Sequence, residues 1–403
     1  MTLATGEAID VQPIIDWLLG DIPDATSEGL VLELATRLVD AGVRLTRIAA
    51  FVRTLHPGIM GRSFVWKRGV PGVVLTLAPH AVMSTPMFIN SPSGQVFSLN
   101  REHRWRLDGD DPLPYSALVE QRAAGMTDYL GVPLPFMGGA VHVITYATDG
   151  AGGFSDAELD ALRRVTKPLT RVAEILSLAR NAANLLDVYV GHHAGERILA
   201  GHVKRGETER IHCVIWFSDL RGFTTLSAQR EPEATIEILN RLFDCQVPAV
   251  EKHGGEVLKF IGDGMLAIFK VSSLAAAADV VHEALAAARE AFTALDVWNH
   301  ARAKAGDDAL HFGLALHVGE VGYGNIGGAD RLDFTCIGPA VNLAARVEGL
   351  ASKLGKRLLL TEAVAELVSA RTRSLGAHAV KGVEPAPTVY ELVDTWSMPP
   401  PAG

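Results

Sequence analysis

The sequence predicts a mixed α+β chain with a βαββαβ core in its C-terminal half, an α/β domain in its N-terminal half and a helix between them. From Cys213 to Leu360, apolar runs and amphipathic segments follow the order strand, helix, strand, strand, helix, strand. A separate alternation of helical and strand-like segments fills residues 1–160. Between the two regions, apolar or small residues recur at spacings of four and three, which is a heptad pattern.

The composition fits a well-packed chain of two or three domains. Its 403 residues are 48% hydrophobic, and a formal net charge of −9 argues against a general nucleic-acid-binding protein. The three cysteines are scattered without CxxC spacing, so we expect buried thiols in a reducing cytosol and no metal site at them. We see neither an apolar run of about 18 residues nor the features of a signal peptide. We therefore expect a cytoplasmic protein with no transmembrane segment.

The N-terminal region, residues 1–160, is expected to form one domain. The expected elements, in order, are a helical region over 11–41, strands over 45–55, 63–67 and 95–99, a solvated loop over 100–114, a helix over 116–124 and central strands over 129–135 and 140–148. Ser155 is expected to cap the next helix, with Glu158 three residues later completing a capping box.

This order of elements, with the phrases GVPLPF and GGFSDAELDAL, resembles a GAF domain. The resemblance implies a sensor that binds an unknown small-molecule or protein signal. A dimerisation scaffold without a ligand is the alternative. The first 200 residues contain no cysteine to attach a bilin chromophore, and His56, His80 and His103 lack ligand spacing, so we interpret them as ordinary surface or core residues.

Residues 161–206 are expected to form a helical linker whose heptad seam pairs with a second copy as a parallel coiled coil. The seam positions are Val165, Leu169, Val172, Leu176, Ala179, Ala183, Leu186 and Val190. Pro168 predicts a kink or a new helix start near the beginning of the seam. The alternative is that this helix packs on its own N-terminal domain. His192 and His193, just after the seam, are interpreted as loop residues.

The C-terminal half is organised around the stretch VIWFSDLRGFTTLS, residues 214–227. An apolar strand ends at Ser218-Asp219, and a turn containing Gly222 follows. A carboxylate at a strand end is well placed to hold a hard cation, with the adjoining Leu220 as a further ligand. The backbone N–H groups of Phe223 and Thr224 are candidates to meet a polyphosphate. The alternative is that Asp219 is a surface residue that caps the next helix.

Two further stretches add chemistry to this one. EVLKFIGDGMLAIF, residues 256–269, predicts a β-hairpin with Asp263 at its tip. Two aspartates at separate strand ends are suited to a two-metal phosphoryl-transfer site. DFTCIGPAVNLAARVE, residues 333–348, predicts a short strand and then a helix on which Asn342 and Arg346 share a face. Arginine is suited to stabilise charge on a reacting phosphate.

These residues together resemble the class III nucleotidyl cyclases, whose catalytic domain would here span residues 207–395. The resemblance implies that Asp219 and Asp263 bind metal and that Asn342 orients the ribose. It also implies that Arg346 stabilises the transition state. Lys259 and Thr335 occupy the base-reading positions. Many relatives carry Asp where this chain has Thr335, and guanylyl cyclases usually carry Glu and Cys at the two positions, so the pair favours ATP.

The resemblance also implies a ferredoxin-like core, two Mg²⁺ or Mn²⁺ ions per site, and a homodimer in which each copy supplies half of each site. Lys381 lies near the position where relatives carry a lysine for the terminal phosphates, and a solvated lysine is the alternative. The expected product is cyclic AMP, with regulation by the N-terminal domain. Residues 396–403, rich in proline, are expected to be a disordered tail.

Three alternatives stay open. A guanylyl cyclase is disfavoured by Lys259 and Thr335. A diguanylate cyclase is suggested by the phrase HGGE at residues 253–256, but that phrase leads into a strand, whereas Asp263 occupies the hairpin tip. A catalytically silent ligand-sensing scaffold would be expected to lack at least one of the six family side chains, and all six are present.

Overall fold

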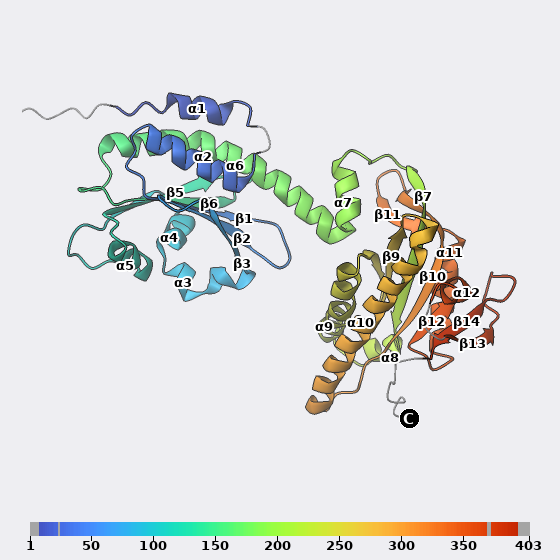
Figure 1. The fold of residues 1–403 in the computed structure, drawn as a ribbon. Coiled ribbons are helices and arrows are strands. Elements are labelled where there is room, and N and C mark those ends of the chain that lie inside the picture. Colours follow the sequence, from blue (N-terminus) through green and yellow to red (C-terminus); the bar gives the residue numbers. More distant parts are fainter. Residues whose placement is uncertain (1–7, 23–24, 369–371, 394–403) are drawn as a thin grey trace, which may run out of the picture. The chain divides into compact units, whose positions relative to one another are not determined.

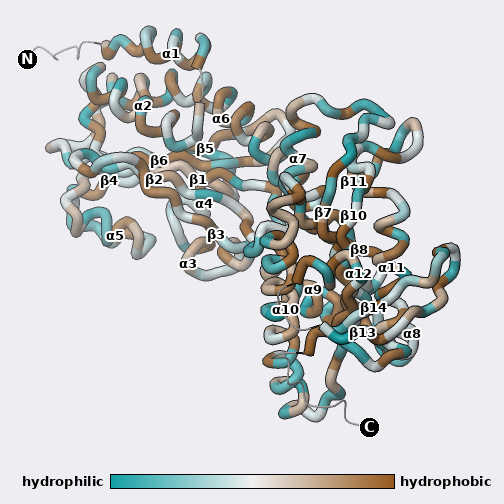
Figure 2. Tube along the Cα trace, turned by 45° about the vertical axis from the view of Figure 1, so that its right-hand side comes forward, coloured by the Kyte–Doolittle hydropathy of each residue, from teal (hydrophilic) through white to brown (hydrophobic). Residues whose placement is uncertain are grey.

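The computed structural model describes residues 8–22, 25–368 and 372–393, and the expected tail at 396–403 lies outside these ranges. The chain divides into two compact units, Met1–Val188 and Tyr189–Gly403, which are described separately below (Figure 1). Among the described residues, no helix has the length and apolar character needed to span a membrane. In Figure 2, hydrophobic residues are concentrated along the central strands of each sheet, such as β1, β6, β7 and β10.

The N-terminal unit is built on an antiparallel sheet with the strand order β3-β2-β1-β6-β5-β4. The strands are β1 (Arg47–Arg53), β2 (Gly61–Lys67), β3 (Val74–Ala78), β4 (His103–Arg106), β5 (Asp128–Pro135) and β6 (Val141–Thr148). Helices α1 (Gln12–Leu19), α2 (Ser27–Asp40) and α6 (Asp156–Val190) cover one face, and α3 (Pro86–Ile89), α4 (Pro92–Leu99) and α5 (Ser116–Ala123) lie on the other (Figure 1). The main core lies between the sheet and the first group of helices.

Two predictions for residues 95–114 of this unit are wrong. Residues 95–99, expected as a strand, belong to helix α4, because the Ser91 hydroxyl caps the helix by accepting from the Gly94 N–H at 3.0 Å and Pro92 suits the first turn. The loop expected over 100–114 contains strand β4, which pairs with β5 and extends the sheet. The helix over 116–124 and the two central strands are confirmed.

The capping box at the start of α6 is confirmed. The Glu158 carboxylate accepts from the Ser155 backbone N–H at 2.7 Å, and the Ser155 hydroxyl accepts from the Glu158 N–H at 3.3 Å. Arg44, 114 residues away, donates to the same carboxylate from both its backbone N–H and its guanidinium, at 2.8 and 2.6 Å. These donors hold the pKa of buried Glu158 at about 2, although burial opposes ionisation. This carboxylate therefore ties α6 to the segment that precedes β1.

Helix α6 is continuous from Asp156 to Val190, so no new helix starts at Pro168. The first half of the expected seam packs on its own unit: Val165 and Leu169 are buried in the core, and Val172 and Leu176 pack against it. A different set of apolar residues faces solvent. We call it the α6 stripe; it comprises Ile175, Leu178, Ala182, Leu185 and Tyr189. Its spacing is three, four, three and four, so the heptad pattern available to a partner is shifted from the expected seam.

The C-terminal unit has the βαββαβ order that the sequence predicts. The elements are β7 (Thr208–Leu220), α9 (Pro232–Lys252), β8 (Glu256–Ile261), β9 (Gly264–Val271), α10 (Ala277–Ala305) and β10 (Phe312–Gly327). Their strands lie in the order β10-β7-β9-β8 and are antiparallel, which is the ferredoxin-like arrangement. Further strands β12 (Leu358–Thr361), β14 (Thr388–Leu392) and β13 (Thr372–Ala377) extend the sheet beyond β10.

Alternate residues of β7 supply the two faces of this sheet. Val214 and Trp216 pack against α9 and α10, whereas Cys213 and Ile215 belong to the core under α11 (Pro339–Ala351). All three cysteines are buried with free thiols, as expected. One expectation is wrong here: His192 and His193, interpreted as loop residues, begin helix α7 (His192–Leu199). Residues 312–327 form a single strand, β10, and its last residues pair with β11 (Leu332–Ile337). β7 pairs with β10 along its whole length, which keeps β10 extended.

We predict that Glu158→Gln lowers the free energy of unfolding by about 2–3 kcal/mol at pH 7, because the buried carboxylate that accepts from Arg44 and Ser155 is replaced by a neutral amide. The folded-state pKa of Glu158, about 2, lies below its ordinary value of 4.5. The advantage of the wild type is therefore full above pH 4.5 and is lost as the pH falls toward 2. Urea unfolding of both proteins between pH 7 and pH 3 measures this difference.

The matched control is Asp160→Asn on the same helix, where the exposed ion pair with Arg164 has a separation of 4.0 Å. We expect that substitution to change the unfolding free energy by less than about 0.5 kcal/mol. Equal effects of the two substitutions, or a Glu158 effect that does not depend on pH, would contradict the role assigned to the Glu158 carboxylate.

Candidate active site

Asp219 and Asp263 lie in contact at one end of the C-terminal sheet. Asp219 is the second-last residue of β7, and Asp263 lies in the turn between β8 and β9. The turn packs closely on the end of β7: a Cβ on Gly264 would lie 2.7 Å from the Ser218 carbonyl oxygen and 3.1 Å from Asp219 Oδ1. Glycine at 264 therefore allows the hairpin tip to approach β7, and this approach brings the two carboxylates together.

The two carboxylates repel each other when both are charged. Burial, then the charge of Asp263 and a hydrogen bond from it, raises the pKa of Asp219 to about 6. A divalent cation between them relieves that repulsion, and carboxylate oxygens are the ligands that Mg²⁺ prefers. The side chain of Leu220 is buried in the core, so only its backbone carbonyl is available as the further ligand that the sequence suggested. No group of three or more His, Cys, Asp or Glu suited to a metal is found within the described ranges.

Glu348 was not predicted and adds a third carboxyl group here. It projects from α11 toward β10, where a Cβ on Gly313 would lie 2.3 Å from its Oε1. Gly313 is the residue of β10 that pairs with Asp219. Burial and the charge of Asp219 raise the pKa of Glu348 to about 7, and Arg221 partly offsets this. No sequence pattern predicts this contact of Glu348, because the contact depends on how α11 packs on the sheet.

The turn after Asp219 has the geometry that the sequence suggested. Gly222 has a φ of 69° and precedes α8 (Phe223–Ala228). The first intrahelical hydrogen bond runs from the Leu226 N–H to the Gly222 carbonyl at 3.0 Å. The N–H groups of Phe223 and Thr224 precede it and have no intrahelical acceptor. The Phe223 ring packs against the core, and Thr224 is exposed.

The two base-reading candidates lie on β8 and β11, which do not pair with each other in the sheet: β8 pairs with β9, and β11 pairs with β10. Lys259 on β8 forms an ion pair with Asp333 on β11, a residue that the sequence analysis did not select. Thr335 follows Asp333 by two positions, so both side chains lie on the same face of β11. Thr335 is 4% exposed, and its Oγ1 is buried without a hydrogen-bond partner among the described residues. A buried hydroxyl without a partner is costly, and a ligand that donates to it removes the cost.

Asn342 and Arg346 lie on the exposed face of α11, one turn apart. Arg346 follows Asn342 by four positions, whereas Glu348 is two further on, about 200° around the helix from Arg346. Helix α11 therefore presents Glu348 toward Asp219 and presents Arg346 away from it. Within one chain the arginine and the aspartates do not converge.

Lys381 lies in an exposed turn between β13 and β14. In the sheet, β12 and β10 separate β14 from β7. The structure does not bring Lys381 together with Asp219 or Asp263 in a single chain, and its role stays a prediction.

Comparison with known proteins agrees with these observations. Residues 203–393 match the family model described as the adenylate and guanylate cyclase catalytic domain. An adenylate cyclase of Anabaena cylindrica is 32% identical over 200 residues, which cover 47% of this chain and 38% of that protein. The chain thus spans well under half the length of the first curated relatives that it matches.

Solved structures with similarity to the chain include cyclases of both specificities. The adenylyl cyclase CyaB from P. aeruginosa is 30% identical, with coverage of 47% of this chain and 97% of that chain and a TM-score of 0.43. The guanylyl cyclase Cya2 is 27% identical, with coverage of 48% and 98% and a TM-score of 0.41. On the strength of the family match and the curated relatives, residues 203–393 are a class III nucleotidyl cyclase catalytic domain.

Proposed function

We propose that the chain is an adenylate cyclase that converts ATP to 3′,5′-cyclic AMP and pyrophosphate. The observation that carries the proposal is the contact between Asp219 and Asp263 at the ends of β7 and the β8–β9 hairpin, inside a domain of this family. Two adjacent carboxylates suit divalent cations and a polyphosphate substrate. Mg²⁺ or Mn²⁺, two per site, fits these hard oxygen ligands, with the Leu220 carbonyl beside them.

The preference for ATP over GTP rests on Lys259 and Thr335. The Lys259 ammonium donates to an unprotonated ring nitrogen of adenine, and the unpaired Thr335 Oγ1 accepts from the exocyclic amine. Guanine presents an oxo group and a protonated ring nitrogen at these positions, which offers neither contact. The ion pair with Asp333 holds the lysine side chain against β11, the strand that carries Thr335, and so positions it for the base.

The reaction is an in-line displacement. The ribose 3′-oxygen attacks the α-phosphorus, the bond to the bridging oxygen breaks, and pyrophosphate leaves. Bound divalent cations supply neutralisation of the phosphates and a lowered pKa of the 3′-hydroxyl. Arg346 donates to the α-phosphate oxygens as charge develops, and Asn342 orients the ribose. The N–H groups of Phe223 and Thr224 face the phosphates, and Lys381 is a further candidate for the terminal phosphate.

We infer that each site is shared between two copies of the chain. Arg346 and Asn342 are exposed on the face of α11 that points away from Asp219, so a second copy must supply them to the aspartates of the first. A symmetric dimer then contains two complete sites. We propose that residues 1–160 form a GAF-like sensor domain. This domain regulates the pairing of the two copies through the linker over 161–206.

A guanylate cyclase is the second candidate, since the chain also resembles a solved guanylyl cyclase. The two functions differ in the nucleotide consumed. They are separated by assaying the purified full chain with ATP or GTP and with Mg²⁺ or Mn²⁺.

We predict cyclic AMP from ATP, with little product from GTP. Lys259→Ala and Thr335→Ala should each lower kcat/KM for ATP by about tenfold or more, because a base-reading hydrogen bond is lost. The matched control is Lys252→Ala, which removes an exposed lysine that pairs with Glu290 on α10 and should change kcat/KM by less than about twofold. Cyclic GMP as the main product would contradict the assignment of the base, and no product under any condition would contradict the enzyme itself.

A complementation experiment tests the shared site. Asp219→Ala and Arg346→Ala should each be inactive alone, since each destroys both sites of its homodimer. Mixing them in equal amounts should restore up to about a quarter of wild-type activity, because half of the dimers are mixed and each mixed dimer holds one intact site. Isotope-labelled or differently tagged chains confirm that mixed dimers form. Proven mixed dimers without activity would contradict a site built from two copies.

The register of the linker gives a third prediction. We propose that the coiled coil uses the α6 stripe, so Leu178→Glu should weaken self-association of the full chain by about tenfold or more, because a charge replaces an exposed apolar side chain of the stripe. Ala179→Glu, at a position of the originally expected seam, is the matched control and should have a smaller effect. Analytical ultracentrifugation measures both. A larger effect at Ala179 would restore the register expected from the sequence.

A further inference from the structure

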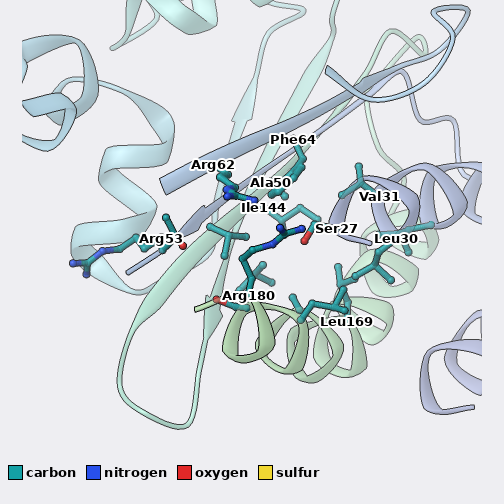
Figure 3. Close-up of a pocket in the computed structure, with 17 residues that line it drawn as sticks. Ser27, Leu30, Val31, Ala50, Arg53, Arg62, Phe64, Ile144, Leu169 and Arg180 are labelled. Atoms are coloured by element: carbon teal, nitrogen blue, oxygen red, sulfur yellow. The ribbon is translucent and has the colours of Figure 1, made fainter. Parts of the chain in front are cut away.

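A small cavity lies in the N-terminal unit, between the sheet and helices α2 and α6 (Figure 3). Its volume is about 50 Å³. One water needs about 10–15 Å³ on this measure, so the cavity holds a molecule of only a few non-hydrogen atoms. Most of its wall is apolar and includes Leu30, Phe64, Ile144 and Leu169. Such a wall fits a short hydrocarbon chain.

Two arginines interrupt this apolar wall. Arg62 comes from β2 and Arg180 from α6. In Figure 3 the guanidinium groups of both lie at the cavity, and that of Arg180 lies near Ser27, whereas Arg53 points away. Neither Arg62 nor Arg180 forms an ion pair or a side-chain hydrogen bond with any other residue in the part of the chain that the structure describes. Two like charges therefore face one cavity without a bound counter-charge.

The environment of Arg62 shows why this arrangement needs an anion. Its Nε is buried without a hydrogen-bond partner among the described residues. Burial lowers the pKa of Arg62, the charge of Arg180 lowers it further, and Glu28 partly offsets both. Glu28 is close enough to act through its charge but forms no ion pair with either arginine in the described ranges. An unpaired, partly desolvated cation is costly, and an anion that accepts from both guanidinium groups removes that cost.

We propose that this cavity is a binding site for a short-chain monocarboxylate. The carboxylate lies between Arg62 and Arg180, whose planar guanidinium groups match its two oxygens. The hydrocarbon chain lies against the apolar wall formed by α2, α6 and the sheet. The 14-residue helix α2 begins at Ser27, so its N-terminal end adds a favourable potential for the anion.

The wall and the volume narrow the class of ligand. Inorganic phosphate has the charge but leaves the apolar wall without a partner. A short alcohol contacts the apolar wall but leaves both arginines without a counter-charge. A nucleotide or a long-chain fatty acid exceeds the cavity volume of about 50 Å³. A carboxylate of about three or four carbons meets all three conditions on charge, apolar surface and size.

The test is a titration of the purified full chain with small ligands. Binding is measured by isothermal titration calorimetry and by ligand-observed NMR. The probes are propionate and butyrate, with 1-butanol as the control for the hydrocarbon chain alone and inorganic phosphate as the control for charge alone. We expect saturable binding of at least one carboxylate, at least about tenfold tighter than either control. Equal binding of phosphate would overturn the role of the apolar wall, and no saturable binding of any carboxylate would overturn the site.

Variants locate the binding. Arg62→Met and Arg180→Met should each weaken carboxylate binding by about tenfold or more, because each removes one guanidinium from the carboxylate. Arg164→Met is the matched control on α6, since Arg164 pairs with Asp160 outside the cavity lining, and it should leave binding unchanged. Ala50→Leu fills the cavity from β1 without removing charge and should abolish binding while the protein stays folded by circular dichroism. Unchanged binding in folded Ala50→Leu or in both arginine variants would overturn the assignment.

These experiments measure carboxylate binding and do not depend on cyclic nucleotide formation. Failure of the carboxylate site therefore leaves the proposed adenylate cyclase activity untouched, and the reverse also holds. The cavity wall includes Leu169, Leu176 and Arg180 of α6, so a bound carboxylate contacts the helix that carries the α6 stripe.

Discussion

The candidate active site depends on one close approach, that of the β8–β9 turn onto the end of β7. Gly264 makes it possible, because a side chain there would collide with the Ser218 carbonyl oxygen. The approach is held by β7, which lies between β9 and β10 in the sheet and buries Trp216 and Ile215 on opposite faces. As a result Asp219 and Asp263 share a site in which each raises the energy of the other's charge, and a cation is the natural partner of such a pair.

Helix α11 carries the remaining candidate site residues on two different faces. Glu348 and the buried Ala344 and Val347 face the sheet, whereas Asn342 and Arg346 are exposed. A helix turns by about 100° per residue, so these sets cannot reach the same ligand from one chain. The proposed dimer follows from this geometry together with the family match, and it explains why an arginine suited to a phosphate has no ionic partner among the described residues. The N-terminal unit adds a long helix with an exposed apolar stripe and a cavity with two unpaired arginines.

Local features were predictable from the sequence, and features that depend on distant contacts were not. The positions of Asp219 and Asp263 follow from apolar runs that end beside glycine-containing turns, and the capping box of Ser155 and Glu158 is a local pattern. The ion pair of Lys259 with Asp333 joins residues 74 positions apart, and Glu348 acquires its role only through packing on Gly313. Residues 95–99 resembled a strand because Val96 and Phe97 are apolar, whereas the cap at Ser91 makes them helical. The first half of the expected linker seam satisfies a heptad, but Val165 and Leu169 pack on their own core, which a sequence pattern does not distinguish from a contact with a partner.

The central claim is that one active site needs two copies of the chain. The most direct measurement is the specific activity of the wild-type protein over a wide range of protein concentrations, with the oligomeric state measured in parallel by sedimentation. A shared site predicts that specific activity falls on dilution in step with the fraction of dimer and reaches a plateau when dimerisation is complete. Constant specific activity in samples that sedimentation shows to be monomeric would contradict the account, because a single chain would then hold a complete site.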